Sequence, residues 1–319
     1  MNYEDTLNTL NTFIENNETK EIENESIDKS LEKSFLNRSE GMGLEYNDEI
    51  NSFEYSDKYS YIRYSQLQTK EGEEVPILAI YTSSPSNKNN ASYIGSVSNG
   101  YHFIGNEYLN NKIRDNISSV NAPILTEKTL IEKNYAKMYN QIVIKNKNNV
   151  PKIGDIYPQF IISNSYNGTK SVSISFGLAI SNSKEDNLIG TSLTRLGNIK
   201  QIHFKTSSTT ISSNMANYIE VFNGNIYDLV ESNLSRKFTE TDVFQTLELI
   251  EKVSKRKRDE ISTLLNNSCK DGKNSFWDMF NVIIKFSSYE KNINSKLILE
   301  SIAERVLELP SKMLKLVSK

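Results

Sequence analysis

The stretch from Phe160 to Ile180 reads FIISNSYNGTKSVSISFGLAI and carries the strongest structural signal in the sequence. At its centre, Asn167 and Gly168 tolerate the positive φ angles that a type I′ turn needs at its two central positions. After the turn, apolar residues alternate strictly with small or polar ones: Val172, Ile174, Phe176, Leu178 and Ile180. The stretch therefore predicts a β-hairpin with a two-residue turn, whose second strand buries one face.

Other elements before residue 236 are predicted from shorter patterns. Strands are expected at residues 75–81, 93–98, 101–104 and 199–204, whereas residues 106–117 and 125–140 look helical. Asn99 and Gly100 separate the second and third of these strands, so we expect another tight turn there. The first two thirds of the chain are thus predicted to be rich in β-structure.

After Arg236 the apolar residues follow a helical period. Thr239 or Thr241 can cap the first of three predicted helices, the second covers residues 276–289, and Pro310 helps to end the third. Trp277 widens the apolar stripe of the second helix, so we expect it in the core. The sequence predicts an α+β fold, in which a β-rich N-terminal and central body with antiparallel hairpins precedes a helical C-terminal region.

Three parts of the chain differ in composition. Residues 1–52 are rich in Asn, Glu and Ser, and we expect a flexible acidic and polar arm. Within it, Asp5 to Asn16 could instead form a short amphipathic docking helix. Residues 53–235 are predicted to form the β-rich core domain, and residues 236–319 a helical region packed on that core.

Composition limits the classes of function. The 319 residues carry a net charge of −3 and a pI near 5.7, so a polyanion would have to bind at a local patch. A single cysteine, Cys269, excludes an internal disulfide and fits a reducing compartment. The first residues are acidic and polar, and no run of roughly 18 apolar residues occurs, so we expect a cytoplasmic protein and no membrane partner.

Catalytic signatures are missing from the sequence. His102, His203 and Cys269 cannot supply the four ligands of a structural zinc site. No phosphate-binding glycine loop occurs, so we expect no cofactor and favour a non-enzymatic protein. A carboxylate-dependent Mg²⁺ site or hydrolase stays open as an alternative, for which Asp155, Glu220 and Asp278 are scattered candidates.

The first candidate for nucleic-acid binding is the strand at Lys200–Lys205. Its alternation places Lys200 with Ile202 and Phe204 on one face and three polar residues on the other. The candidate site residues of this strand are Lys200, Gln201, His203 and Lys205. They could contact phosphates, although a solvated sheet face explains the same pattern.

The second candidate is the basic run Lys255, Arg256, Lys257 and Arg258. On a helix these four cations spread around the axis, and neighbouring carboxylates such as Glu260 lie at i,i+4 spacing. A salt-bridged surface helix is therefore the alternative to a polyanion site. The many Tyr and Phe residues could also stack on bases, although most are expected in the core or on sheet faces.

Several segments together resemble the "phage/plasmid-like protein" family, known as domain of unknown function nine-three-two. The similar segments are Val97–Asn106, Ser165–Gly168, Gly177–Ser183, Lys200–His203 and Trp277–Tyr289. The family's Arg, Cys and final Gly of the middle motif are replaced here by Gly177, Ile180 and Ser183, and its C-terminal His by Tyr289. The resemblance implies a mobile genetic element and no particular reaction.

These observations lead to a functional prediction. We expect a non-enzymatic protein encoded by a phage or plasmid, acting in DNA metabolism in the host cytoplasm by binding or annealing single-stranded DNA. The alternative is a protein-binding module, such as an inhibitor of a host factor or a subunit of a phage assembly. A homo-oligomer is compatible with either function.

Overall fold

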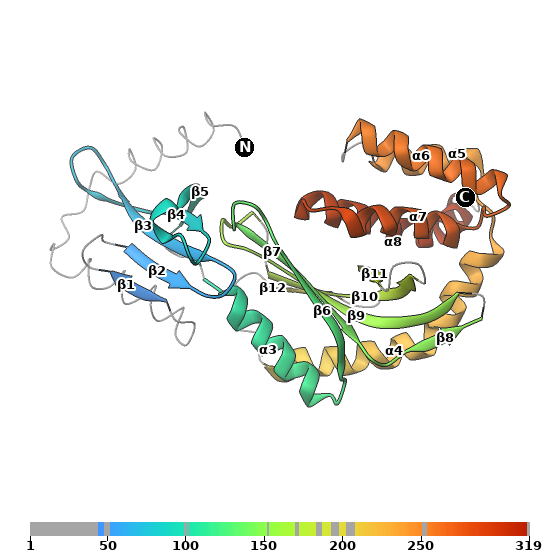
Figure 1. Ribbon diagram of the computed structural model, residues 1–319, viewed down its shortest axis with the longest axis horizontal. Coiled ribbons are helices and arrows are strands. Elements are labelled where there is room, and N and C mark those ends of the chain that lie inside the picture. The colour runs from blue at the N-terminus through green and yellow to red at the C-terminus, as the bar shows by residue number, and fades with distance from the viewer. Residues whose placement is uncertain are drawn as a thin grey trace.

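The computed structural model describes residues 44–47, 52–98, 101, 103–151, 153–169, 172–182, 187–192, 198–201, 208–250 and 254–317 (Figure 1). Two antiparallel sheets precede the C-terminal helices, so the predicted α+β class is confirmed. Strand β1 (Glu45–Asn47) lies within the range predicted for the arm, and residues 1–43 lie outside the described part. In the part of the chain described, no helix is both long and apolar enough to cross a membrane.

The first sheet is a five-stranded meander. It contains β1, β2 (Ser52–Ser56), β3 (Tyr61–Gln68), β4 (Glu74–Ser83) and β5 (Ser92–Ser98) in sequence order, with a 3₁₀ turn, η2 (Lys88–Asn90), before β5. Alternation places one apolar set on the inner face: Phe53, Tyr55, Ile62, Tyr64, Leu78 and Ile80. The predicted strands at 75–81 and 93–98 are confirmed. The strand predicted at 101–104 is wrong for its described residues, because Phe103 leaves the sheet to fill this core.

The second sheet has seven strands. Its strands are β6 (Ile124–Ile131), β7 (Lys137–Ile144), β8 (Asn148–Val150), β9 (Gly154–Ser165), β10 (Val172–Asn182), β11 (Asn187–Ser192) and β12 (Asn198–Gln201). The main order is β11-β10-β9-β7-β6, with β12 paired to β10 and β8 to β9. The helix predicted at 125–140 is wrong, because β6 and β7 form a hairpin whose long-range pairing to β9 overrides local propensity.

The hairpin at Asn167-Gly168 is confirmed, but its predicted turn type is wrong. Ser163 pairs with Ser173, and in this register the connection between β9 and β10 has one residue more than a two-residue turn at Asn167-Gly168 would allow. Gly168 has a φ of +67°, whereas Asn167 is not among the described residues with positive φ. Instead, the Asn167 side chain accepts a hydrogen bond from Thr169 Oγ1 at 2.7 Å, which closes the longer turn locally.

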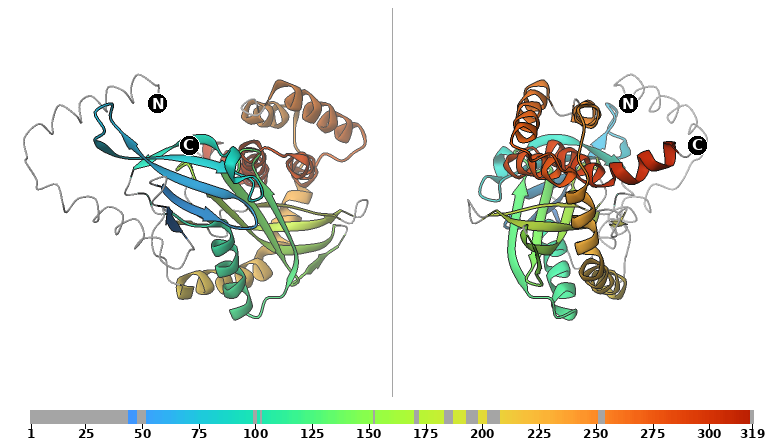
Figure 2. Two further views of the ribbon diagram at one scale, coloured as in Figure 1. Left: turned by 60° about the vertical axis from the view of Figure 1, so that its left-hand side comes forward. Right: turned by 90° about the vertical axis from the view of Figure 1, so that its right-hand side faces the viewer.

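Helices cover both faces of the second sheet (Figures 1 and 2). On one side lie α3 (Asn106–Ser119) and α4 (Ser208–Ser235), and on the other α7 (Phe276–Tyr289) and α8 (Ile293–Val317). The outer helices α5 (Glu240–Ile250) and α6 (Lys255–Lys270) pack on α7 and α8. The sheet face toward α3 and α4 is largely apolar and belongs to the main core, with Met138, Ile142, Phe160, Ile162, Ile174 and Phe176.

The tip of the second sheet reaches into the core of the first. Tyr166, which directly follows β9, is 1% exposed, and its ring stacks on Phe103 with centroids 5.7 Å apart. Its hydroxyl accepts a hydrogen bond from the backbone N–H of Asn106 at 2.9 Å. Tyr101 adds a hydrogen bond from its hydroxyl to the Ser165 carbonyl at 3.0 Å. The two sheets therefore share a packed junction.

Trp277 is buried in α7, at 1% exposure, as predicted. Its indole N–H has no hydrogen-bond partner in the described part of the chain, so its contribution comes from packing. We predict that Trp277→Ala lowers the free energy of unfolding by about 3–5 kcal/mol, because removal of the indole leaves a cavity that the neighbouring side chains do not fill. Trp277→Phe should cost clearly less, since no hydrogen bond is lost. Urea denaturation measures both, and an equal cost for the two variants would contradict this view.

Candidate functional site

The predicted polar strand is only partly described. Lys200 and Gln201 lie in β12, where they pair with Ser173 and Val172 of β10, whereas His203 and Lys205 lie outside the described residues. The structure thus confirms a strand at 199–201. Whether its polar face binds phosphate stays a prediction.

The basic run 255–258 begins helix α6, and carboxylates lie close to three of its four cations. Arg256 Nε lies 2.9 Å from a carboxylate oxygen of Glu260, and Lys257 forms an ion pair with Glu290. Arg258 Nε lies 4.0 Å from an Asp259 oxygen, and Lys255 is exposed. These contacts favour the salt-bridged helix. They also compete with phosphate for the same cations.

The outer face of the five-stranded sheet presents a different set of side chains. One cross-strand row runs through all five strands in register: Glu45, Glu54, Arg63, Tyr81 and Tyr93. Its members alternate with the residues of the inner core, so they point away from that core. The row is acidic at the β1 and β2 end, and aromatic and cationic at the β3 to β5 end.

Within this row the cation and the two rings touch in sequence. Arg63 Cζ lies 4.7 Å from the centroid of the Tyr81 ring, a cation–π contact. The Tyr81 and Tyr93 rings are 5.8 Å apart at 64°, and Tyr93 is 60% exposed. Arg63 Nε is buried and has no hydrogen-bond partner in the described residues. The row therefore holds a guanidinium oriented by Tyr81, with the exposed ring of Tyr93 at its end.

The neighbouring positions on this face complete the surface. From β2 to β5 the next row consists of small residues, Ser52, Ser65, Ala79 and Ser96, so the larger row stands above them. On the other side, the ring of the buried Tyr61 lies 5.4 Å from the ammonium of Lys88. Burial and a hydrogen bond to Glu54 raise the pKa of Tyr61, so its hydroxyl stays protonated.

We call Arg63, Tyr81, Tyr93 and Lys88 the Tyr–Arg face. Exposed aromatic rings can stack on bases, and cations beside them can pair with phosphates. Sequence reasoning missed this face because its members meet only through strand register, across irregular spacings. The alternation of residues 61–64, Tyr-Ile-Arg-Tyr, is the local signal that could have indicated it.

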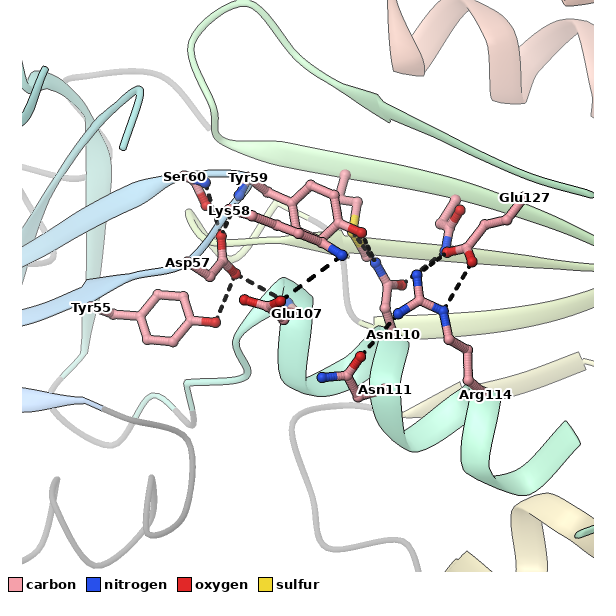
Figure 3. A network of polar contacts seen from close by, with 12 residues as sticks. Tyr55, Asp57, Lys58, Tyr59, Ser60, Glu107, Asn110, Asn111, Arg114 and Glu127 are labelled. Carbon is pink, nitrogen blue, oxygen red and sulfur yellow. Dashed lines mark hydrogen bonds and ion pairs between the residues drawn. The ribbon is translucent and has the colours of Figure 1, made fainter. Parts of the chain in front are cut away.

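A polar network fixes the five-stranded sheet on helix α3 (Figure 3). Asp57, in the turn between β2 and β3, accepts hydrogen bonds from the backbone N–H groups of Tyr59 at 2.7 Å and Ser60 at 2.9 Å. Its other oxygen accepts from the Tyr55 hydroxyl at 2.7 Å and from the Glu107 N–H at 3.0 Å. Since Glu107 lies in the first turn of α3, Asp57 caps this helix from a distant part of the chain.

Gly105 is needed at this junction for steric reasons. It is the N-cap residue of α3, and a Cβ atom there would lie 2.4 Å from the Tyr55 hydroxyl oxygen. A glycine cannot cap the helix with a side chain, so the cap comes from Asp57. The turn of the first sheet and the start of α3 are therefore held in one arrangement.

The same network continues from α3 into the seven-stranded sheet (Figure 3). Arg114 donates from Nε and Nη2 to the two carboxylate oxygens of Glu127, both at 2.9 Å. Asn140 donates to Glu127 at 2.7 Å and to Asn110 at 3.0 Å, and Asn110 donates to the Tyr59 hydroxyl at 3.1 Å. Because Asp57 and Glu127 are both engaged, this network fits a structural joint better than an acid–base site.

Other carboxylates give no catalytic constellation in the described chain. Asp155 binds Lys147 at 2.8 Å, and this hydrogen bond holds the pKa of Asp155 below its usual range. Asp278 forms a capping box with Ser275, and Glu220 lies on the exposed side of α4. No group of three or more His, Cys, Asp or Glu residues is placed to hold a metal, as far as the described residues go.

Comparison of the chain with family models, curated proteins and solved structures gives no match. The resemblance to the phage and plasmid family thus remains a proposal that depends on the motifs quoted above.

We predict that Asp57→Ala lowers the free energy of unfolding by about 2–3 kcal/mol, because several partly buried donors lose a charged acceptor. Asp155→Ala is the matched control. It removes a partly exposed surface carboxylate bound to Lys147, and should cost much less than Asp57→Ala. Thermal and urea denaturation of both variants give the comparison. Equal costs would show that Asp57 does not fasten the sheet to α3.

Proposed function

We propose that the protein binds single-stranded DNA through the Tyr–Arg face, as a non-enzymatic component of phage or plasmid DNA metabolism in the host cytoplasm. The observation that carries this proposal is the contact chain from Arg63 through Tyr81 to the exposed Tyr93. The Arg63 guanidinium supplies the positive charge of this chain, which a phosphate oxygen can pair with. The family resemblance supports the same setting.

In this proposal each side chain has a separate task. A base stacks on Tyr93, which is worth about 1–3 kcal/mol per base, and Tyr81 holds the plane of the Arg63 guanidinium. Arg63 and Lys88 neutralise phosphates, whereas Glu45 and Glu54 repel them, so the strand path lies toward β4 and β5. A duplex hides its base faces in the stack, so single strands should bind in preference to duplexes.

The cross-strand row from Glu45 to Tyr93 has an acidic end and an aromatic, cationic end. This arrangement makes recognition of a protein the second candidate function. Tyr and Arg are enriched at the energetic centres of protein interfaces. The acidic end at Glu45 and Glu54 would then pair with cations of a host or phage protein. A pull-down from host lysate with and without nuclease separates the two functions, because only a nucleic-acid-mediated association is lost after nuclease treatment.

Replacing Tyr93 tests the stacking role. We predict that Tyr93→Ala weakens binding of a fluorescent oligonucleotide of about 30 nucleotides by about 5- to 150-fold, whereas Tyr93→Phe keeps the ring and the affinity. Tyr289→Ala is the matched control, since Tyr289 is 58% exposed but lies at the end of α7. Fluorescence anisotropy measures all three variants. Wild-type binding weaker than about 10⁻⁴ M would end the proposal.

The salt dependence tests the phosphate contacts. Each phosphate neutralised on a single strand contributes about 0.7 to the slope of log K against log salt. We predict that Arg63→Ala with Lys88→Ala flattens this slope. Replacing Lys255, Arg256, Lys257 and Arg258 with Ala should change it less, since three of them already have carboxylate neighbours. A larger change of slope in the quadruple variant than in the double variant would indicate that the phosphate contacts lie on α6.

A further inference from the structure

A buried carboxyl group joins the helical layer to the second sheet. Glu300 of α8 is fully buried, and its Oε1 accepts hydrogen bonds from the Tyr139 hydroxyl at 2.6 Å and the Ser287 hydroxyl at 3.3 Å. The same oxygen lies 3.4 Å from the Lys296 ammonium. Oε2 has no hydrogen-bond partner in the described residues. One oxygen therefore carries the polar contacts and the other is left without any.

Four elements meet at this point. Lys296 is 7% exposed, donates to the Ser287 carbonyl at 3.0 Å and lies 4.9 Å from the centroid of the Tyr139 ring. Thr191 of β11 donates from its hydroxyl to the Glu300 carbonyl at 3.1 Å. Strands β7 and β11 and helices α7 and α8 are thus joined through a single ion pair and its neighbours.

The sheet face beneath these helices carries a chain of polar side chains beside its apolar residues. Gln141 donates to Gln159 at 2.7 Å, and Gln159 donates to the Thr191 carbonyl at 2.7 Å. Farther along the same face, the hydroxyls of Ser163 and Ser173 lie 2.7 Å apart. The opposite face, toward α3 and α4, is largely apolar. The helices α7 and α8 therefore cover groups that water can also satisfy.

The two halves of α8 are attached differently. At its start, Ile293 and Leu297 belong to a small apolar cluster with Tyr139, Ile161 and Leu130. Farther along, the helix enters the main core through Leu299, Ile302, Ala303, Val306 and Leu307. Apolar burial scales with area, so the first half of α8 is held less strongly than the second.

A buried ion pair stabilises little overall, because desolvation of the two charges offsets their attraction. Burial raises the pKa of Glu300 above its usual range, against the opposing charge of Lys296. Burial and the charge of Glu300 also raise the pKa of Tyr139, so its hydroxyl stays a hydrogen-bond donor. Glu304, one turn farther along α8, is buried as well. A carboxyl group with a raised pKa contributes stability that is present at low pH and lost as pH rises through that pKa.

We propose that residues 293–300 of α8 and the adjoining end of α7 form a latch over this sheet face, which opens with Leu299 and leaves the rest of the main core folded. The Lys296–Glu300 ion pair sets how often the latch opens. Opening uncovers Tyr139 and Ser163, register partners whose row continues to Ser173 and then to Lys200 of β12. This device is independent of the proposed DNA binding.

Native-state hydrogen exchange of the full chain tests the latch. At low urea, the amides of residues 293–300 should exchange through an opening with a much smaller urea dependence than that of α4. After correction for the intrinsic exchange rate, this opening should become more frequent as pH rises. Exchange of these amides only by the global route, with the urea dependence of α4, would overturn the proposal.

Variants provide a second measurement. Lys296→Met with Glu300→Gln removes both charges at similar size, and should slow exchange at 293–300 roughly fivefold or more and remove its pH dependence. Lys296→Met alone leaves the carboxylate unpaired, so exchange should accelerate roughly tenfold or more. The control pair, Arg256→Met with Glu260→Gln, lies on the exposed side of α6 and should leave α8 unchanged. Unchanged exchange in the double variant would also overturn the proposal.

Discussion

The packing of Tyr166 into the first sheet is the interaction on which the rest of the structure depends. The residue belongs by sequence to the hairpin of the second sheet, yet its ring lies in the core formed by Phe103, Tyr55 and Tyr64. Its hydroxyl accepts a hydrogen bond from the first backbone N–H of helix α3. Because burial raises its pKa well above the usual range, Tyr166 stays neutral there and its burial carries no charge cost. One side chain thus ties together two sheets and a helix.

This junction bears on the candidate site because the Tyr–Arg face is the opposite side of the same thin sheet. A single meander of five strands has little stability by itself. The Tyr166 contact and the Asp57 cap fasten this sheet to the rest of the fold, and backbone pairing keeps β3, β4 and β5 in register. That register decides whether Arg63, Tyr81 and Tyr93 form one row. The geometry of the proposed binding surface therefore depends on the contacts that hold the opposite face of this sheet.

Local patterns predicted much of this fold. Alternation located β4, β5, β9 and β10, and helical periods located α3 and α7, because these signals arise within a few residues. Strand pairing decided the failures in the sheets, whereas among the helices α8 continues past Pro310, which was expected to help end it. The register of Ser163 with Ser173 requires a longer turn at Asn167 than the predicted one. Residues 125–140 lie mostly in the two strands of a hairpin and not in a helix, because β7 pairs with β9. Helix α4 was missed although Met215, Tyr218, Phe222 and Ile226 follow a helical period, since its Asn, Ser and Gly residues disfavour helices.

The site was harder to predict than the fold. Clusters of Lys and Arg are visible in a sequence, and they drew attention to residues 200–205 and 255–258. A cross-strand row has no such signature, because its members come from five strands. For the same reason, no sequence pattern indicates that Asp57 caps a helix 50 residues away.

Hydrogen exchange of the full chain with and without a single-stranded oligonucleotide of about 30 nucleotides tests the central claim most directly. The Tyr–Arg face predicts slower exchange in β3, β4 and β5, at residues 61–68, 74–83 and 92–98. Protection confined to β12 and the start of α6, or no protection at saturating oligonucleotide, would contradict it.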